Sequence, residues 1–133
     1  MKIAMLISQR ATCLRGSVGC IITMNNRIIS SGYNGVLHGE KECSSNTCDI
    51  SNNCKRAVHA EVNAIAAAAR HGVSLIGAEL ITTCAPCTNC AMIIAQSGIT
   101  SVLYKESYSN SEGLTLLGKM GVRPRQYVTT ETV

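Results

Sequence analysis

The sequence has no tryptophan and no phenylalanine, and only four tyrosines among 133 residues. Proteins that bind extended single strands of nucleic acid stack the bases on aromatic side chains, so this scarcity argues against that class. There is no run of eighteen apolar residues, which excludes a membrane-spanning helix. The length and the 46% hydrophobic content instead fit one compact domain with a modest core.

The charge is only mildly unbalanced. Twelve Lys and Arg against eight Asp and Glu give a net charge of +4, spread along the chain and not gathered in a tail. This excess suits an anionic small molecule as well as a nucleic acid. Residues 1–13 include a short apolar run without a convincing cleavage site, so we interpret them as an amphipathic helix and not as a signal peptide.

Cysteine, in contrast, is abundant, with eight residues in the chain. Without a secretory signal, metal ligation is a more natural use of these thiols than disulfides. Two zinc sites would use most of them.

The hydrophobic pattern alternates between two periodicities and predicts both helices and strands. Helices are expected at 2–11, 58–70, 87–98 and 111–120, and strands at 18–23, 27–32, 78–83, 99–104 and 125–130. Asn25 and Asn26 are turn residues between the first two strands. This order predicts an α/β layer fold around a central sheet. The polar, Cys-rich loop at about 36–57 is unusually long for a compact domain unless it is functional or held by a staple.

The segment CAPCTNC at 84–90 holds three cysteines around Pro86. Cys87 and Cys90 fall in the first turn of a predicted helix, so both thiols can point to one spot ahead of its N-terminus. The helix dipole there favours the thiolate that a metal needs. Cys84 precedes Pro86 and lies at the end of a predicted strand, so geometry favours Cys87 and Cys90 as the metal-binding pair.

The third ligand is suggested by HAE at 59–61, also at a helix start. His59 with two cysteines leaves one open position, as in catalytic zinc sites. Glu61 can then reach over that position as a general acid/base. His-x-Glu followed by Pro-Cys-x-x-Cys is the signature of zinc-dependent deaminases. The alternative, a buried histidine beside an unrelated structural cysteine pair, explains the joint pattern poorly.

Four longer stretches, two of which contain these motifs, resemble the deoxycytidylate (dCMP) deaminases, and most closely their bacterial and phage branch. They are VGCIITMNNRIISSGYNG at 18–35, HAEVNAIAAAA at 59–69, AELITTCAPCTNCAMIIAQSGI at 78–99 and VLYKESY at 102–108. The resemblance covers nearly the whole length. It implies a single deaminase domain over residues 1–133, with the cytidine deaminase-like fold: a three-layer αβα sandwich around a mixed sheet of about five strands.

The implied activity is that of a hydrolase that converts dCMP and water to dUMP and ammonia, supplying dUMP for thymidylate synthesis. By the resemblance, His59, Cys87 and Cys90 hold zinc that polarises a water, and Glu61 shuttles the protons. Asn34 resembles the family's sugar-side asparagine, and Tyr108 a tyrosine near the phosphate. Ser17 is a further candidate phosphate donor. A turn asparagine, a structural tyrosine and a solvated serine are the respective alternatives.

Many members of this family are homohexamers that dCTP activates and dTTP inhibits, with Mg²⁺ accompanying the triphosphate. The resemblance places the effector site at Tyr33, Asn34, Gly35, Asn63 and Arg70. Arg70 also ends a helix, where a cation is favourable in any case. We therefore expect dCMP, dCTP, dTTP and other copies of the chain as partners, and neither membrane nor nucleic acid. The expected location is the cytoplasm, or the host cytoplasm if the chain is phage-encoded.

Some members carry a second, structural zinc near the long loop, and the resemblance suggests that Cys13, Cys43, Cys48 and Cys54 hold it here. A tetrahedral thiolate site would order a loop that lacks apolar anchors. His38 could replace one ligand, and reduced, unliganded cysteines are the alternative. Cys20 and Cys84, both on predicted strands, are expected to be small buried apolar residues.

Two rival functions remain open. One is deamination of another substrate, either free cytosine or guanine or a base in nucleic acid. The other is a zinc-stabilised assembly module without catalysis. Glu61 argues against the second, because a purely structural zinc site has no use for a general base.

Overall fold

A five-stranded mixed sheet forms the centre of the computed structural model, which describes residues 1–48 and 54–129. The strand order is β2-β1-β5-β6-β7. β1 is antiparallel to both neighbours, whereas β5, β6 and β7 run parallel. The strands are β1 (Gly19–Met24), β2 (Arg27–Tyr33), β5 (Glu79–Cys84), β6 (Ser101–Glu106) and β7 (Arg123–Gln126). The predicted α/β class with about five strands is confirmed.

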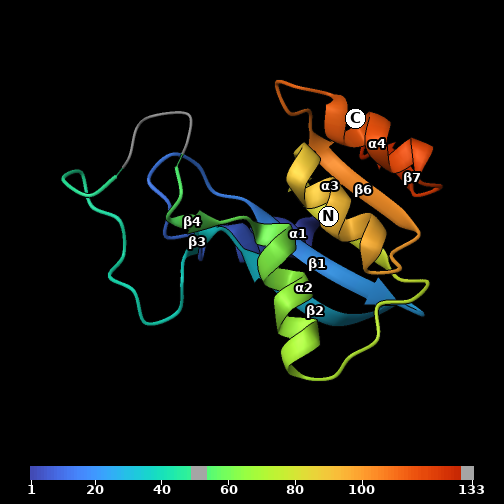
Figure 1. Cartoon of the computed structure of the whole chain (residues 1–133), viewed down its shortest axis with the longest axis horizontal. Coiled ribbons are helices and arrows are strands. Elements are labelled where there is room, and N and C mark those ends of the chain that lie inside the picture. The colour runs from blue at the N-terminus through green and yellow to red at the C-terminus, as the bar shows by residue number, and fades with distance from the viewer. Residues whose placement is uncertain (49–53, 130–133) are drawn as a thin grey trace.

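Helices lie on both faces of this sheet (Figure 1). They are α1 (Lys2–Ser8), α2 (Ala60–Arg70), α3 (Thr88–Gln96) and α4 (Glu112–Lys119). Two glycines of the β1–β2 hairpin show which helix covers which face of the sheet. Gly19 on β1 and Gly32 on β2 are offset by one position in the pairing of the two strands, so they face opposite sides. A side chain at Gly32 would meet the backbone of α2, and one at Gly19 would meet the backbone of α1. α1 and α2 therefore cover opposite faces.

Small residues make up nearly half of the buried core cluster, and several of them lie on α2. Ala60, Ala64 and Ala68 are buried, and their spacing of four residues puts them on one stripe of α2. Such a stripe lets the helix lie close to the strands. The larger buried side chains of the same cluster come from β1, β5, β6, α3 and α4: Ile22, Leu80, Val102, Ile94 and Leu117.

The β1–β2 turn is confirmed. Asn25 and Asn26 both have positive φ, 50° and 59°, as a tight two-residue hairpin turn requires. The last strand differs from its prediction at 125–130: it spans Arg123–Gln126, and residue 130 lies outside the described part. The observed strand includes Pro124. Within the described sheet β7 pairs with β6 alone, and a proline is tolerated on such an edge strand.

The first helix also ends earlier than predicted, at Ser8 instead of residue 11. Gln9 caps it, and residues 9 and 10 form a turn. Arg10 and Ala11 donate hydrogen bonds to the carbonyls of Ile7 and Ser8. The shorter helix frees residues 11–18 to run as a loop toward the ends of β1 and β2.

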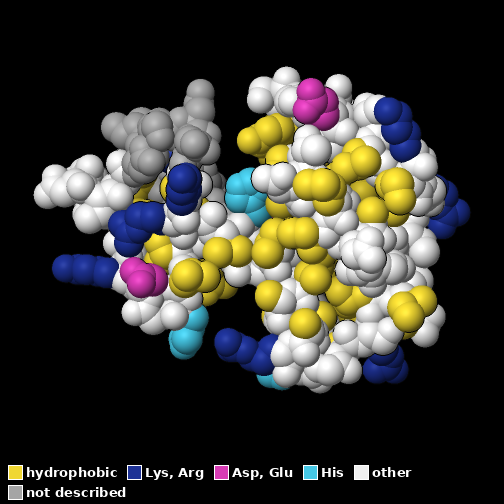
Figure 2. All heavy atoms as spheres, viewed as in Figure 1, with side chains coloured by type: hydrophobic (Ala, Val, Ile, Leu, Met, Phe, Trp, Pro, Cys, Tyr) yellow, Lys and Arg dark blue, Asp and Glu magenta, His cyan; other side chains and the backbone are white. Residues whose placement is uncertain are grey.

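The Cys-rich loop is closed at its base by a small two-stranded sheet that the sequence did not predict. β3 (Gly35–Val36) pairs antiparallel with β4 (Ala57–Val58). Arg56 donates hydrogen bonds across the loop to the carbonyls of Thr47 (3.3 Å) and Lys41 (3.0 Å). The segment after β3 leads away from the main sheet in Figure 1, and Lys and Arg side chains gather on this part of the surface in Figure 2. Residues 49–53 of the predicted loop lie outside the description.

Within residues 1–48 and 54–129, none of the helices combines the length and apolar character needed to cross a membrane.

Candidate active site

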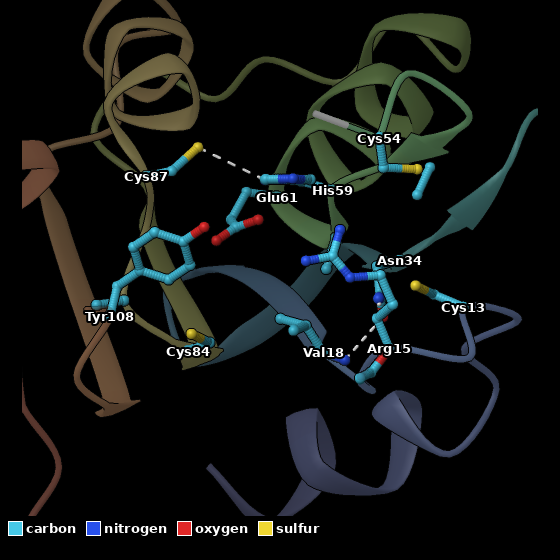
Figure 3. Close-up of a pocket in the computed structure, with 14 residues that line it drawn as sticks. Cys13, Arg15, Val18, Asn34, Cys54, His59, Glu61, Cys84, Cys87 and Tyr108 are labelled. Carbon is cyan, nitrogen blue, oxygen red and sulfur yellow. Dashed lines mark hydrogen bonds between the residues drawn. The ribbon is translucent and has the colours of Figure 1, made fainter. Parts of the chain in front are cut away.

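Two helix N-termini meet at one end of the sheet and bring the predicted metal ligands together. His59 is the N-cap of α2 and Cys87 the N-cap of α3, and both have extended backbones. An extended residue directly before a helix can aim its side chain across the helix start. In Figure 3, His59 and Cys87 point toward each other from these two elements, and the carboxylate of Glu61 lies close by.

The distances among the three candidate ligands fit zinc. The Nδ1 atom of His59 lies 3.6 Å from the Cys87 Sγ and 3.3 Å from the Cys90 Sγ. A tetrahedral zinc with ordinary bond lengths separates a nitrogen and a sulfur ligand by roughly 3.6 Å. Among the described residues, these three alone form a group of three His, Cys, Asp or Glu ligand atoms within 4.8 Å of one another.

Glu61 lies beside this cluster without belonging to it. Its Oε2 is 3.7 Å from the Cys90 Sγ, and the residue is only 4% exposed. Burial raises the pKa of its carboxyl above the ordinary value. A carboxyl that is buried next to a three-ligand metal site can both take up and return a proton near neutral pH.

The pKa values of the two thiols shift in opposite directions. The pKa of Cys87 falls to about 3, first because of its hydrogen bond with Cys90 and then because of His59. The pKa of Cys90 is raised by the same hydrogen bond and by burial. The hydrogen bond with Cys87 also raises the pKa of His59. Metal binding must therefore release protons from this site.

The cluster opens into a cavity of about 280 Å³. Arg15, which the sequence analysis did not single out, lines this cavity together with Glu61 and Tyr108. Its guanidinium points into the cavity, and Tyr108 faces it from the other side (Figure 3). Arg15 is the one Lys or Arg among the described lining residues. A cation on the cavity wall favours a ligand with an anionic group.

Asn34, predicted to contact substrate, lines the same cavity and also holds the loop that carries Arg15. Its Oδ1 accepts a hydrogen bond from the Val18 N–H (2.7 Å), and its Nδ2 donates to the Gly16 carbonyl (2.8 Å). Its backbone carbonyl accepts from the Thr12 N–H at 3.2 Å. These bonds fix residues 12–18 at the pocket wall.

Ser17 does not line this cavity. It lies in a neighbouring hollow, which also includes Ser8 and Lys105. Gly16, Val18 and Cys84 line both spaces, so the two adjoin. Contact between Ser17 and a phosphate stays a prediction.

The predicted effector residues are only partly gathered. The Asn63 side chain donates to the Tyr33 carbonyl at 2.8 Å, which ties α2 to the end of β2 beside Asn34 and Gly35. Arg70 stands at the other end of α2, about 10 Å along the helix from Asn63. The structure thus brings four of the five residues close together and leaves Arg70 two turns away.

The four cysteines predicted for a second zinc are not gathered into one cluster. Cys13 and Cys54 line the cavity beside His59, and Cys43 and Cys48 lie on the long loop. No three of their sulfurs fall within 4.8 Å of one another in the described structure. Of the other two, Cys20 is fully buried as expected. Cys84 is half-buried and lines the cavity, because the end of β5 reaches the pocket.

Comparison with known proteins gives the family. The sequence profile described as "Cytidine and deoxycytidylate deaminase zinc-binding region" matches residues 1–106. The chain is 35% identical over 141 residues to the deoxycytidylate deaminase of Schizosaccharomyces pombe, covering 98% of this chain and 44% of that protein. It is 42% identical over 104 residues to ComE operon protein 2 of Bacillus subtilis, covering 77% and 55%. The chain thus spans about half the length of these relatives.

A solved structure agrees with the sequence matches. The dCMP deaminase of the cyanophage S-TIM5, crystallised with dCMP and dUMP, superimposes with a TM-score of 0.86 at 33% identity. The match covers 95% of this chain and 92% of that one. The chain belongs to the cytidine and deoxycytidylate deaminase family, and its sheet and helices have the cytidine deaminase-like fold.

Proposed function

We propose that this chain is a zinc-dependent hydrolase that deaminates dCMP to dUMP and ammonia, and so supplies dUMP for thymidylate synthesis. One observation carries the proposal. His59, Cys87 and Cys90 form a zinc-compatible cluster beside the buried Glu61, in a cavity whose wall also presents Arg15. The deoxycytidylate deaminases among the relatives support the same reaction.

His59 Nδ1 and the sulfurs of Cys87 and Cys90 would hold the metal, which when bound lowers the pKa of a water and polarises it. Glu61 is placed to accept a proton from water. It delivers this proton to the pyrimidine ring nitrogen, and it then carries the second proton, from the hydroxyl group formed on carbon 4, to the departing amino group. The raised pKa of its carboxyl suits this proton transfer. It makes the free-energy difference between the protonated and ionised forms smaller near neutral pH, so the group can take up and release a proton easily.

The cavity supports a single nucleotide as substrate. Its volume of about 280 Å³ is just below the usual range of small-molecule sites, roughly 300 to 1,000 Å³, which fits one small ligand. In our proposal the base lies over Glu61 and the 5′-phosphate pairs with Arg15. Tyr108 and Ser17 are further phosphate donors, and Asn34 contacts the sugar. A monophosphate would add a charge-assisted contact with Arg15 that a nucleoside cannot make.

Initial-rate assays on dCMP, deoxycytidine and a short deoxycytidine oligonucleotide test this assignment. We expect dCMP to have by far the highest kcat/KM. Faster turnover of the oligonucleotide or of a free base would replace dCMP with the rival substrate class. A zinc-loaded protein that is inert toward all three would favour the non-catalytic assembly module.

We further propose that dCTP with Mg²⁺ activates and dTTP inhibits the enzyme in a homohexamer, at Tyr33, Asn34, Gly35, Asn63 and Arg70. Asn34 links this region to the substrate pocket, because the same side chain holds the Arg15 loop. Saturation with dCMP should be sigmoidal without dCTP and hyperbolic with it. Hyperbolic saturation that neither dCTP nor dTTP changes would contradict the proposed regulatory site.

A second, structural zinc at Cys13, Cys43, Cys48 and Cys54 is part of the same proposal, as is a cytoplasmic location where thiols stay reduced. Binding would require the long loop to draw its cysteines toward Cys13 and Cys54. Metal analysis should find two zinc ions per chain, and Cys48→Ser should lower the content to one. One zinc in the wild type, unchanged by Cys48→Ser, would refute the second site.

A further inference from the structure

The first turn of α4 packs directly against the backbone of Pro86 and Cys87. A Cβ at Gly113 would lie 2.9 Å from the Cys87 carbonyl carbon, 3.0 Å from its oxygen and closer still to the Pro86 carbonyl oxygen. Real Cβ atoms essentially never come within 3.0 Å of such atoms. Gly113 does not have the positive φ that would explain a glycine by backbone conformation. It is needed here for space.

The backbone that Gly113 touches is that of a proposed metal ligand. Cys87 caps α3 with an extended conformation, and its carbonyl accepts the first-turn hydrogen bond from the Ala91 N–H at 2.8 Å. Its Sγ is the atom that lies 3.6 Å from the His59 Nδ1. A shift of the 86–87 peptide would therefore move this sulfur relative to His59.

α4 itself is firmly anchored. Leu117, one turn beyond Gly113, is fully buried in the core. At the start of the helix, the Thr88 hydroxyl donates to the Glu112 carboxylate at 3.5 Å. Extra volume at Gly113 would therefore have to displace α4, the Pro86–Cys87 backbone or both, and a shift of that backbone moves the Cys87 sulfur.

We infer that Gly113 is a positioning residue that fixes the Cys87 sulfur through the 86–87 backbone, which makes the first turn of α4 a support of the metal centre. This rests on the proposed metal role of Cys87. Zinc–ligand distances are maintained within about ±0.2 Å, so even a small displacement of the turn degrades the site. Loss of a residue that supports a ligand typically weakens metal binding about 10–100-fold.

Gly113→Ala tests the inference, with Gly118→Ala as the matched control. Gly118 belongs to the same helix, and a Cβ there meets nothing within 4 Å. The readouts are zinc affinity by chelator competition and the thiolate-to-cobalt absorption of the cobalt-substituted protein. We expect Gly113→Ala to shift the cobalt spectrum and to weaken zinc binding about tenfold or more, and Gly118→Ala to change neither. A folded Gly113→Ala protein with wild-type spectrum and affinity would overturn the inference.

If Gly113→Ala does not fold, Glu112→Ala takes its place, because it removes the Thr88 hydrogen bond without adding volume. A smaller spectral shift would support the role of this turn, and an unchanged spectrum would contradict it. Neither readout needs substrate, so both hold whatever base the enzyme deaminates. Failure of the wild type to bind cobalt would contradict the proposed function instead.

Discussion

The Oε2 atom of Glu61 lies 3.7 Å from the Sγ atom of Cys90, although the two residues belong to different helices. Both are almost fully buried. Glu61 adjoins a proposed metal ligand and still lies outside the candidate ligand group. In the proposed mechanism, Glu61 therefore transfers protons while other residues bind the metal.

We predict that Glu61→Gln stabilises the metal-free protein while it abolishes turnover. Burial raises the pKa of Glu61 in the folded state. Its favourable contribution is complete below the unfolded-state value of about 4.3 and is lost as pH rises through the higher folded-state pKa. The stability advantage of glutamine should therefore grow between acid and neutral pH. Urea unfolding at several pH values measures it, with the exposed Glu40→Gln as control; an advantage independent of pH would contradict the account.

Arg15→Gln should weaken selection for the phosphate. Loss of a hydrogen-bonded charge contact costs about 1.5–3 kcal/mol, so we expect the kcat/KM for dCMP to fall about 10–100-fold. Deoxycytidine, which has no phosphate, should lose far less. Arg10→Gln, at an exposed position outside the cavity, is the control. Equal losses on both substrates would mean that Arg15 supports the pocket and does not read the phosphate.

Cys90→Ser should abolish high-affinity zinc binding and turnover together, because serine is a poor zinc ligand beside a thiolate and an imidazole. Cys20→Ala is the matched comparison, since Cys20 is equally buried but faces the core. It should lower the melting temperature and keep the zinc. Zinc retention by Cys90→Ser, measured by metal analysis after dialysis, would contradict the assigned ligand set.

Asn34→Ala should destabilise the protein and raise the KM for dCMP. The change leaves the Val18 N–H and the Gly16 carbonyl without their side-chain partners. Gly16 is exposed and Val18 half-buried, so water can replace part of each lost bond and each costs about 0.5–1.5 kcal/mol. Thermal unfolding and initial rates measure the two effects, with Asn46→Ala on the exposed loop surface as control. A normal KM would show that the Arg15 loop does not depend on Asn34.

The sequence was most informative where local chemistry decides the structure. The Asn25–Asn26 turn was predictable because both residues tolerate positive φ, and His59 and Cys87 because ligands at helix starts have a recognisable spacing. These features depend on a few neighbouring residues.

Arg15 and Gly113 were missed because their roles depend on distant partners. Arg15 reaches the cavity only because Asn34 holds its loop, sixteen or more residues away along the chain. In the sequence, nothing distinguishes Gly113 from any other glycine in a helix. Its role depends on the parallel β5-β6-β7 arrangement, which places α4 against Pro86 and Cys87. The β3–β4 pair was missed for a similar reason, since each strand has only two residues.

The most direct test of the central claim is a product balance. Zinc-loaded wild-type protein and Glu61→Ala are incubated with dCMP, and dUMP and ammonia are quantified in the same samples. We predict equimolar dUMP and ammonia from the wild type and neither from Glu61→Ala, with equal zinc in both proteins. Intact zinc without conversion of dCMP, or conversion that survives Glu61→Ala, would contradict the account.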